Sequence, residues 1–185
     1  MMVFTHAAVG LALASVAVVL SPEHATTAAL AAVSGGAFPD LDLLAGQHRR
    51  TLHFPVLYWL PAFPALAAAA VVPTGLPVAL AAFFLAAAIH SGMDALGAGD
   101  ELRPWEATSE EGVYDHLRGQ WIAPRRWVRY DGAPEDLLLT TLFAVPGFVL
   151  YGETVRTITL FSVILAAGYA LVRKRVPEYF PERLQ

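Results

Sequence analysis

The sequence has no cysteine, a single lysine and few charged residues of either sign. Only 15% of its 185 residues are Asp, Glu, Lys or Arg. Without cysteine, disulfides and thiolate metal ligands are excluded, so any bound metal depends on His, Asp, Glu or backbone oxygen. Lys174 is the one lysine, and the net charge of −4 provides no broad basic field. We therefore expect no nucleic acid as a partner.

Apolar residues are what the chain has in excess. They make up 56% of the sequence, and the mean hydropathy is +0.52, which is above the range of a soluble globular domain. The first apolar run has no Lys or Arg before it, unlike a secretory signal peptide. We expect this run to be retained as a membrane helix, with cleavage as the alternative, and residues 1–185 to form a single integral-membrane domain.

Six apolar segments approach the length of about 20 residues that a spanning helix needs. They are residues 3–20, 25–38, 54–72, 75–96, 136–151 and 154–172. Segment 25–38 is short, so whether it spans is left open, and segment 54–72 contains three prolines that kink a helix. The pattern predicts an all-α, polytopic membrane helix bundle of about five to six transmembrane helices, with one polar loop at residues 98–135.

The basic residues are concentrated on one side of this predicted topology. Six crossings place the N-terminus, residues 39–53, residues 98–135 and the C-terminal tail together. That side contains Arg49, Arg50, Arg103, Arg118, Arg125, Arg126, Arg129, Arg173, Lys174, Arg175 and Arg183, whereas Arg156 lies near the other. Cytoplasmic loops carry the excess of Lys and Arg. We therefore expect a multi-pass protein of the cell (inner or plasma) membrane, with both termini cytoplasmic and membrane lipids as partners.

The same side collects most of the side chains that could bind a metal. Ionisable groups at membrane depth are costly, so they usually face a protein interior or a wet cavity and serve function. The candidates are His6, Asp40, Asp42, His48, His53, His90 and Asp94. His24 alone among the histidines falls on the opposite side. The sequence therefore predicts a His/Asp metal centre that opens to the cytoplasmic interface.

Each motif in this set also has a simpler interpretation. His90 and Asp94 are four residues apart and share a helix face, either as metal ligands or as a hydrogen-bonded pair. The two carboxylates of Pro39-Asp40-Leu41-Asp42 could reach one site or could cap a turn. His48 and His53 would be ligands from a loop and a helix start, or one ligand and one base behind it.

The donor types favour one reaction class. Imidazole with carboxylate suits Zn²⁺, with Mn²⁺ or Fe²⁺ as alternatives. Seven candidates exceed the three protein ligands of a catalytic zinc, so we expect one or two divalent ions, and a two-metal centre is typical of phosphoester hydrolysis. Asp42 or Asp94 would act as base or orient water, and Arg49 would bind the anionic group, unless it only anchors the cytoplasmic side. The expected substrate is a phosphoester of a lipid or lipid-linked compound.

The large polar loop adds an interfacial feature. Its tryptophans and arginines, at Trp105, Trp121, Trp127, Arg125, Arg126 and Arg129, fit a cap at headgroup level that attracts anionic lipid. His116 in the same loop is either a further ligand or an exposed histidine.

The ordered motifs resemble the pattern H…PDxD…HRGxTHS…HxxxD of the YdjM-like family of integral-membrane metal-dependent hydrolases, described as LexA-binding inner-membrane proteins. The match runs from His6 to Asp94, and residues 125–139 are similar to haloarchaeal members. The third motif departs from the pattern, with Arg50 for Gly, Leu52 for Thr and Phe54 for Ser. The resemblance implies a membrane metal hydrolase. Leu52 and Phe54 lack the hydroxyls that the family pattern offers for an oxyanion contact, while both histidines of the motif, His48 and His53, remain.

Two other function classes remain open at this point. A membrane scaffold or regulator would use the cluster as a structural metal site or a hydrogen-bond network, with a closed coordination shell. A small transporter would place ionisable groups at mid-bilayer on several helices, but the segments at 136–151 and 154–172 have none at their centres.

Overall fold

The computed structural model describes residues 1–179, which form a helical bundle with one small β-hairpin. Arg183, counted above among the basic residues, lies outside the described residues. The helices are α1 (Val3–Ala14), α2 (Ala17–Leu20), α3 (Ala25–Ala37), α4 (Trp59–Val71), α5 (Gly75–Met93), α6 (Pro134–Val149) and α7 (Glu153–Val172). Short 3₁₀ helices are η1 (Pro22–His24), η2 (Pro39–Leu43), η3 (Asp94–Leu96), η4 (Pro104–Glu106) and η5 (Arg173–Tyr179). The strands are β1 (Val113–Asp115) and β2 (Gln120–Ile122).

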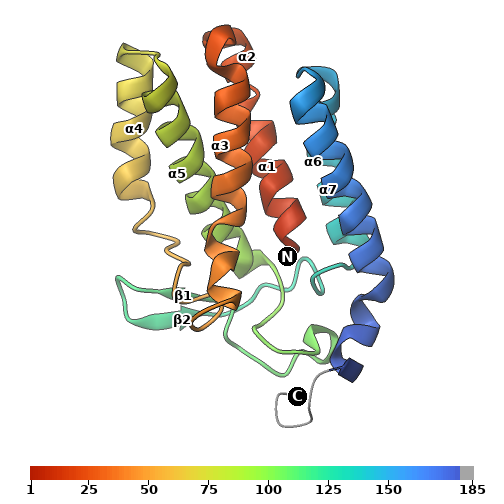
Figure 1. Cartoon of the computed structure of the whole chain (residues 1–185). Helices are drawn as coiled ribbons and strands as arrows, with labels where there is room; N and C mark the ends of the chain where they lie inside the picture. Colours follow the sequence, from red (N-terminus) through yellow and green to blue (C-terminus); the bar gives the residue numbers. More distant parts are fainter. Residues whose placement is uncertain (180–185) are drawn as a thin grey trace.

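The long helices run side by side, and their connecting segments gather at one end (Figure 1). α1 packs against α3, α5 and α6, while α4 packs on α5 and α7 on α6. The N-terminus, the segment from η2 to α4 and the long connection from η3 to α6 all lie at the same end of the bundle (Figure 1). This arrangement brings together the segments that the sequence predicts to share one membrane face.

Two consecutive glycines allow three of these helices to approach closely. A Cβ atom on Gly35 of α3 would lie 2.1 Å from the carbonyl oxygen of Phe83 in α5. A Cβ on Gly36 would lie 2.7 Å from the carbonyl oxygen of His6 in α1. Small residues of this kind are what permit backbone contact between membrane helices. The end of α3 is therefore wedged between the α1 and α5 segments that carry His6 and His90.

Within residues 1–179, three helical segments are long and apolar enough to cross a membrane. They are Val3–Leu20, Gly75–Leu96 and Glu153–Tyr179. The predicted count of five to six spans is not confirmed, because α3, α4 and α6 have only 13, 13 and 16 residues. Large apolar side chains nevertheless face outward from α4 and α7, including Leu60, Phe63, Phe161 and Ile164. An apolar outer surface of this kind is consistent with membrane association.

Two expectations about local structure need correction. The predicted helix at 54–72 begins only at Trp59, after turns at residues 55–58. Pro55 disfavours helical backbone at Phe54, whose N–H instead donates to the Ser91 hydroxyl at 3.2 Å. The all-α prediction missed the antiparallel β1–β2 hairpin, in which Tyr114 pairs with Trp121. Aromatic and β-branched residues on either side of a glycine-containing turn favour such a hairpin.

Candidate metal centre

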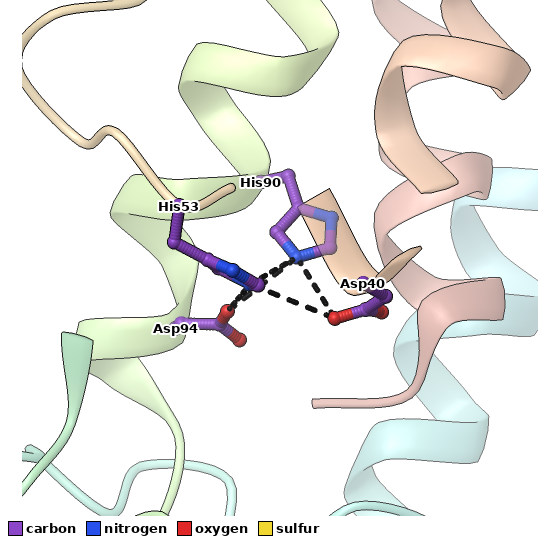
Figure 2. A group of neighbouring side chains, drawn as sticks. All are labelled: Asp40, His53, His90 and Asp94. Carbon is purple, nitrogen blue, oxygen red and sulfur yellow. Dashed lines mark hydrogen bonds and ion pairs between the residues drawn. The ribbon is translucent and has the colours of Figure 1, made fainter. Parts of the chain in front are cut away.

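Four side chains from three segments point toward one another at the loop end of the bundle (Figure 2). His90 lies in the last turn of α5 and Asp94 begins η3 directly after it, so both project from the same face. Asp40 comes from η2, and His53 from the connection between η2 and α4. His53, His90 and Asp94 are at most 2% exposed. These buried His and Asp groups could hold a metal ion.

The distances within this four-residue cluster match a tetrahedral ion site. His53 Nε2 lies 3.1 Å from His90 Nε2 and 3.0 Å from Asp94 Oδ2. His90 Nε2 lies 3.4 Å from Asp94 Oδ2. Asp40 Oδ1 lies 3.4 Å from His90 Nε2 and 3.6 Å from His53 Nε2. Ligands at 2.0–2.2 Å around a tetrahedral ion would be roughly 3.3–3.6 Å apart. Three of the five separations fall in that range, and the two that His53 Nε2 makes with His90 and Asp94 are a few tenths of an ångström shorter.

The hydrogen bonds of the two imidazoles explain why a cation is needed there. His90 Nδ1 lies 2.6 Å from the carbonyl oxygen of Gly36, which can only accept, so this nitrogen carries the proton. His53 Nδ1 lies 2.9 Å from Asp42 Oδ2 and donates in the same way. In the neutral rings both Nε2 atoms would then present lone pairs to each other and to two carboxylates. A proton or a metal ion must lie between them.

Asp42 lies behind His53 and orients two histidines. Its Oδ2 accepts from His53 and its Oδ1 lies 2.9 Å from His48 Nδ1. Burial opposes ionisation, but the hydrogen bonds from His48 and His53 outweigh it and lower the pKa of Asp42 to about 2. A carboxylate that receives the second N–H of a ligating imidazole fixes its tautomer and ring orientation. Asp42, His48 and His53 also form a second group that could hold an ion.

The electrostatics of His53 show the same demand for positive charge. Burial alone would lower its pKa, but hydrogen bonds to Asp40, Asp42 and Asp94 raise it to about 11. The pKa of Asp40 is lowered, since the charge of His90 and hydrogen bonds from His53 and His90 outweigh the effect of burial. Without a metal ion, a proton on His53 therefore supplies the positive charge that offsets the surrounding carboxylates, as a bound metal ion would.

His6 borders the cluster without belonging to the four. Its ring stacks on that of His90 with centroids 3.7 Å apart, and its Nε2 lies 3.2 Å from Asp94 Oδ1. It is only 2% exposed. Contact with the carboxylate oxygen that faces away from the ion centre lets His6 orient Asp94, much as Asp42 orients His53.

Arg49 is held in place by the β-hairpin that the sequence did not reveal. Its backbone has a φ of +57°, a region that non-glycine residues seldom adopt, and its carbonyl accepts the N–H of Tyr114 at 2.9 Å. One guanidinium nitrogen donates to the carbonyls of Ala98 and Gly112. The hairpin thereby fixes the segment between His48 and His53.

The remaining loop candidates are not members of the cluster. His116 packs against Phe54 and Tyr114, with ring centroids 4.5 and 4.9 Å apart, and belongs to neither group that could hold a metal among the described residues. Arg126 bonds Glu110 and Arg129 bonds Glu135. Trp127 remains 71% exposed. Two of the three arginines predicted to attract lipid are thus already paired with carboxylates.

The seven predicted ligand candidates form one connected group. Its members come from α1, from η2, from the connection between η2 and α4, and from the junction of α5 and η3. Each member lies within hydrogen-bond or ring-stacking distance of another. Sequence reasoning missed the Gly36 carbonyl, which sets the tautomer of His90. It also missed Ser91, whose hydroxyl accepts the Phe54 N–H beside His53. A glycine pair just before Pro-Asp-x-Asp was the available signal for such a close approach.

No family model, curated protein or solved structure matches this chain.

Proposed function

We propose that this chain is a membrane-embedded metal-dependent hydrolase that acts on a phosphoester of a lipid or lipid-linked substrate at the cytoplasmic interface. The observation that supports it most is the pair of imidazole Nε2 atoms 3.1 Å apart in the protein interior. Two carboxylates complete their surroundings. The membership of the YdjM-like hydrolases suggested by the motifs is part of this proposal, as is the cytoplasmic orientation inferred from the basic residues.

The donor set fits Zn²⁺ best, with Mn²⁺ or Fe²⁺ as alternatives. Two neutral imidazoles and one or two carboxylates are common ligands of zinc in hydrolases. An ion bound there would supply Lewis-acid activation of water near neutral pH. His53 shares both groups of potential ligands, and its Nδ1 is engaged by Asp42. We therefore assign one principal ion to the four-residue cluster, and Asp42 to the support of His53.

The burial of each residue suggests how the roles divide. His53, His90 and Asp94 are enclosed, whereas Asp40 retains 14% exposure of its side chain and lines a cavity next to the cluster. We assign the three enclosed residues to holding the ion. Asp40 is then the carboxylate placed to accept a proton from an attacking water. Arg49 lines the same cavity and would bind an anionic oxygen of the substrate.

A structural ion site is the second candidate, and one observation favours it. Asp40 is near enough to complete a tetrahedron of four protein ligands, and a closed shell is typical of structural zinc. Substitution of Co²⁺ for Zn²⁺ separates the two candidates, because its visible spectrum reports coordination. Added phosphate or azide would shift the spectrum of a site with an exchangeable position and would leave a closed site unchanged.

The proposal is tested by metal content and hydrolysis together. Detergent-purified wild type should retain metal and hydrolyse a phosphomonoester or phosphodiester in a substrate screen. The double variant His90→Ala/Asp94→Ala should lose both metal and activity while still inserting into the membrane. His24→Ala is the matched control, since His24 lies in η1 and contacts Glu23, outside both groups. Full metal content in the double variant, or wild-type activity without metal, would contradict the proposal.

A further inference from the structure

A cavity of about 530 Å³ lies directly beside the four-residue cluster. Asp40 belongs to both, and His48 and Arg49 also line the cavity wall. Much of the remaining lining is apolar, with Met2, Phe4, Leu43, Leu102 and Val176 among the contributors. The cavity therefore combines polar residues next to the candidate ion site with apolar residues that include Met2 and Phe4 near the start of α1.

Two arginines that are far apart in the sequence, Arg49 and Arg173, line this cavity, and both are almost fully buried. Arg49 is 6% exposed and Arg173 is 5% exposed. Among the described residues, neither Nε of Arg49 nor one terminal nitrogen of Arg173, Nη1, has a hydrogen-bond partner. A buried donor without an acceptor is costly and uncommon in folded proteins. Two such guanidinium donors at one cavity indicate a ligand with acceptor oxygens.

The other contacts of Arg173 hold it rigidly while leaving Nη1 free. Its Nε donates to Asp131 Oδ2 at 2.7 Å and its Nη2 to the carbonyl of Leu102 at 3.2 Å. The guanidinium also lies 5.3 Å from the ring centroid of Trp105. An arginine fixed in this way is pre-organised to bind an oxyanion, because little side-chain entropy remains to be lost.

Asp40, Asp100, Glu101 and Asp131 also line the cavity. Asp40 stays ionised, because the charge of His90 and the hydrogen bonds from His53 and His90 outweigh burial and lower its pKa. Asp131 is neutralised by Arg173 and also accepts the hydroxyl hydrogen of Tyr169. Burial raises the pKa of both Asp100 and Glu101, so each carboxyl ionises less readily than a solvent-exposed one. Glu101 additionally accepts the N–H of Ser109 through Oε2. Asp131 is paired with Arg173 and Asp40 contacts the imidazoles of the cluster, so the donors left for an anion are Nε of Arg49 and Nη1 of Arg173.

We propose that this cavity is a binding subsite for a phosphate-bearing amphiphile, with Arg49 and Arg173 as donors to the phosphate oxygens and the apolar wall against the chain. The sequence pointed to Arg173 only as one of the basic residues of the predicted cytoplasmic side, not as a site residue. The assignment of this ligand as the substrate rests on the proposed function, whereas the binding itself does not. Phosphate of a lipid headgroup and free phosphate offer the same oxygens, and the experiment separates them.

Binding is measured on metal-free, full-length protein so that the result does not depend on the ion site. Inorganic phosphate is titrated calorimetrically into detergent-solubilised wild type. Phosphatidic acid, or neutral diacylglycerol for comparison, is presented in phosphatidylcholine nanodiscs and scored by native mass spectrometry. Arg173→Gln should weaken phosphate binding about ten- to hundred-fold, the usual effect of losing a hydrogen bond to a charged group. Arg175→Gln is the matched control, because Arg175 is exposed two residues further along η5.

Each outcome decides the proposal. If phosphatidic acid binds in an Arg173-dependent way and free phosphate does not displace it, the natural ligand is a lipid headgroup. If free phosphate displaces it at equal concentration, the natural ligand is soluble phosphate. Both results support the subsite. No detectable binding of either probe to wild type overturns it, and so does binding to Arg173→Gln at wild-type strength. If that variant fails to fold, Arg173→Lys preserves the charge beside Asp131 but lacks Nη1, and unchanged binding by it overturns the proposal equally. If the metal-loaded wild type hydrolyses no phosphoester but still binds phosphate in an Arg173-dependent way, the proposed function is refuted and the subsite is not.

Discussion

Replacing the carboxylate of Asp42 by an amide tests whether support of His53 matters for metal binding. In Asp42→Asn the side chain keeps its size but loses its charge and one acceptor. At present Oδ1 receives His48 Nδ1, while Oδ2 receives both His53 Nδ1 and the backbone N–H of Leu52. An amide has one oxygen, so whichever way it turns, one imidazole N–H faces an NH₂ group.

The expected magnitude follows from the role of such carboxylates. Loss of the partner of a ligating imidazole typically weakens metal affinity about 10- to 100-fold, or about 1.4–2.8 kcal/mol. If the amide oxygen turns toward His53 and Leu52, the loss should lie near the lower value, because only the half-buried His48 would then lack an acceptor. Removal of the negative charge still makes His53 a weaker donor to the ion.

The assay is competition for Zn²⁺ between detergent-solubilised protein and a chromophoric chelator. Asp115→Asn provides a matched control, since Asp115 is equally buried and accepts the backbone N–H groups of Leu117 and Arg118 away from the cluster. The control should keep wild-type affinity. An Asp42→Asn affinity within twofold of wild type, or an equal loss in both variants, would refute the assignment of Asp42.

Three further outcomes are expected. Binding of Zn²⁺ near neutral pH should release about one proton, measured in weakly buffered solution. The raised pKa of His53 keeps it protonated in the metal-free protein, and a ligating nitrogen must give up its proton. Metal uptake without proton release would contradict this. Gly35→Ala should destabilise the bundle by about 1–3 kcal/mol in detergent unfolding, since its Cβ would meet the Phe83 carbonyl, whereas Gly168→Ala, with nothing within 4 Å, should lack that clash. Asp136→Ala should cost at least about 3 kcal/mol in the same assay, because the N–H groups of Met2 and Gly132 and the hydroxyl of Thr5 lose their buried acceptor; unfolding at the wild-type midpoint would disprove that role.

The site could be predicted from the sequence better than the fold could. Spacing alone places His90 and Asp94 on one helix face, and the structure keeps them there. The convergence of separate segments was predicted from the cost of ionisable groups near a membrane, which leaves them few places to lie. That constraint does not specify which side chains surround the ion position and which hold those side chains in place. The hydrogen bonds from His53 to Asp42 and from His90 to the Gly36 carbonyl determine this.

Helix lengths and the hairpin could not be read from hydropathy. Apolar runs describe composition, but helix ends are set by local backbone restraints such as the one at Phe54, which precedes proline and donates to Ser91. The β1–β2 hairpin lies in a polar loop, where short strands have weak signals. Its contact with Arg49 through Tyr114 is long-range, and no local pattern indicates it.

The most direct test of the central claim is X-ray absorption spectroscopy of the Zn²⁺-loaded, detergent-purified protein, combined with its metal stoichiometry. The account predicts one tightly held ion per chain, with two imidazole nitrogens and carboxylate oxygen at about 2.0–2.2 Å. Failure to retain zinc after dialysis, or a coordination sphere without imidazole, would contradict the assignment of His53 and His90 to a shared ion.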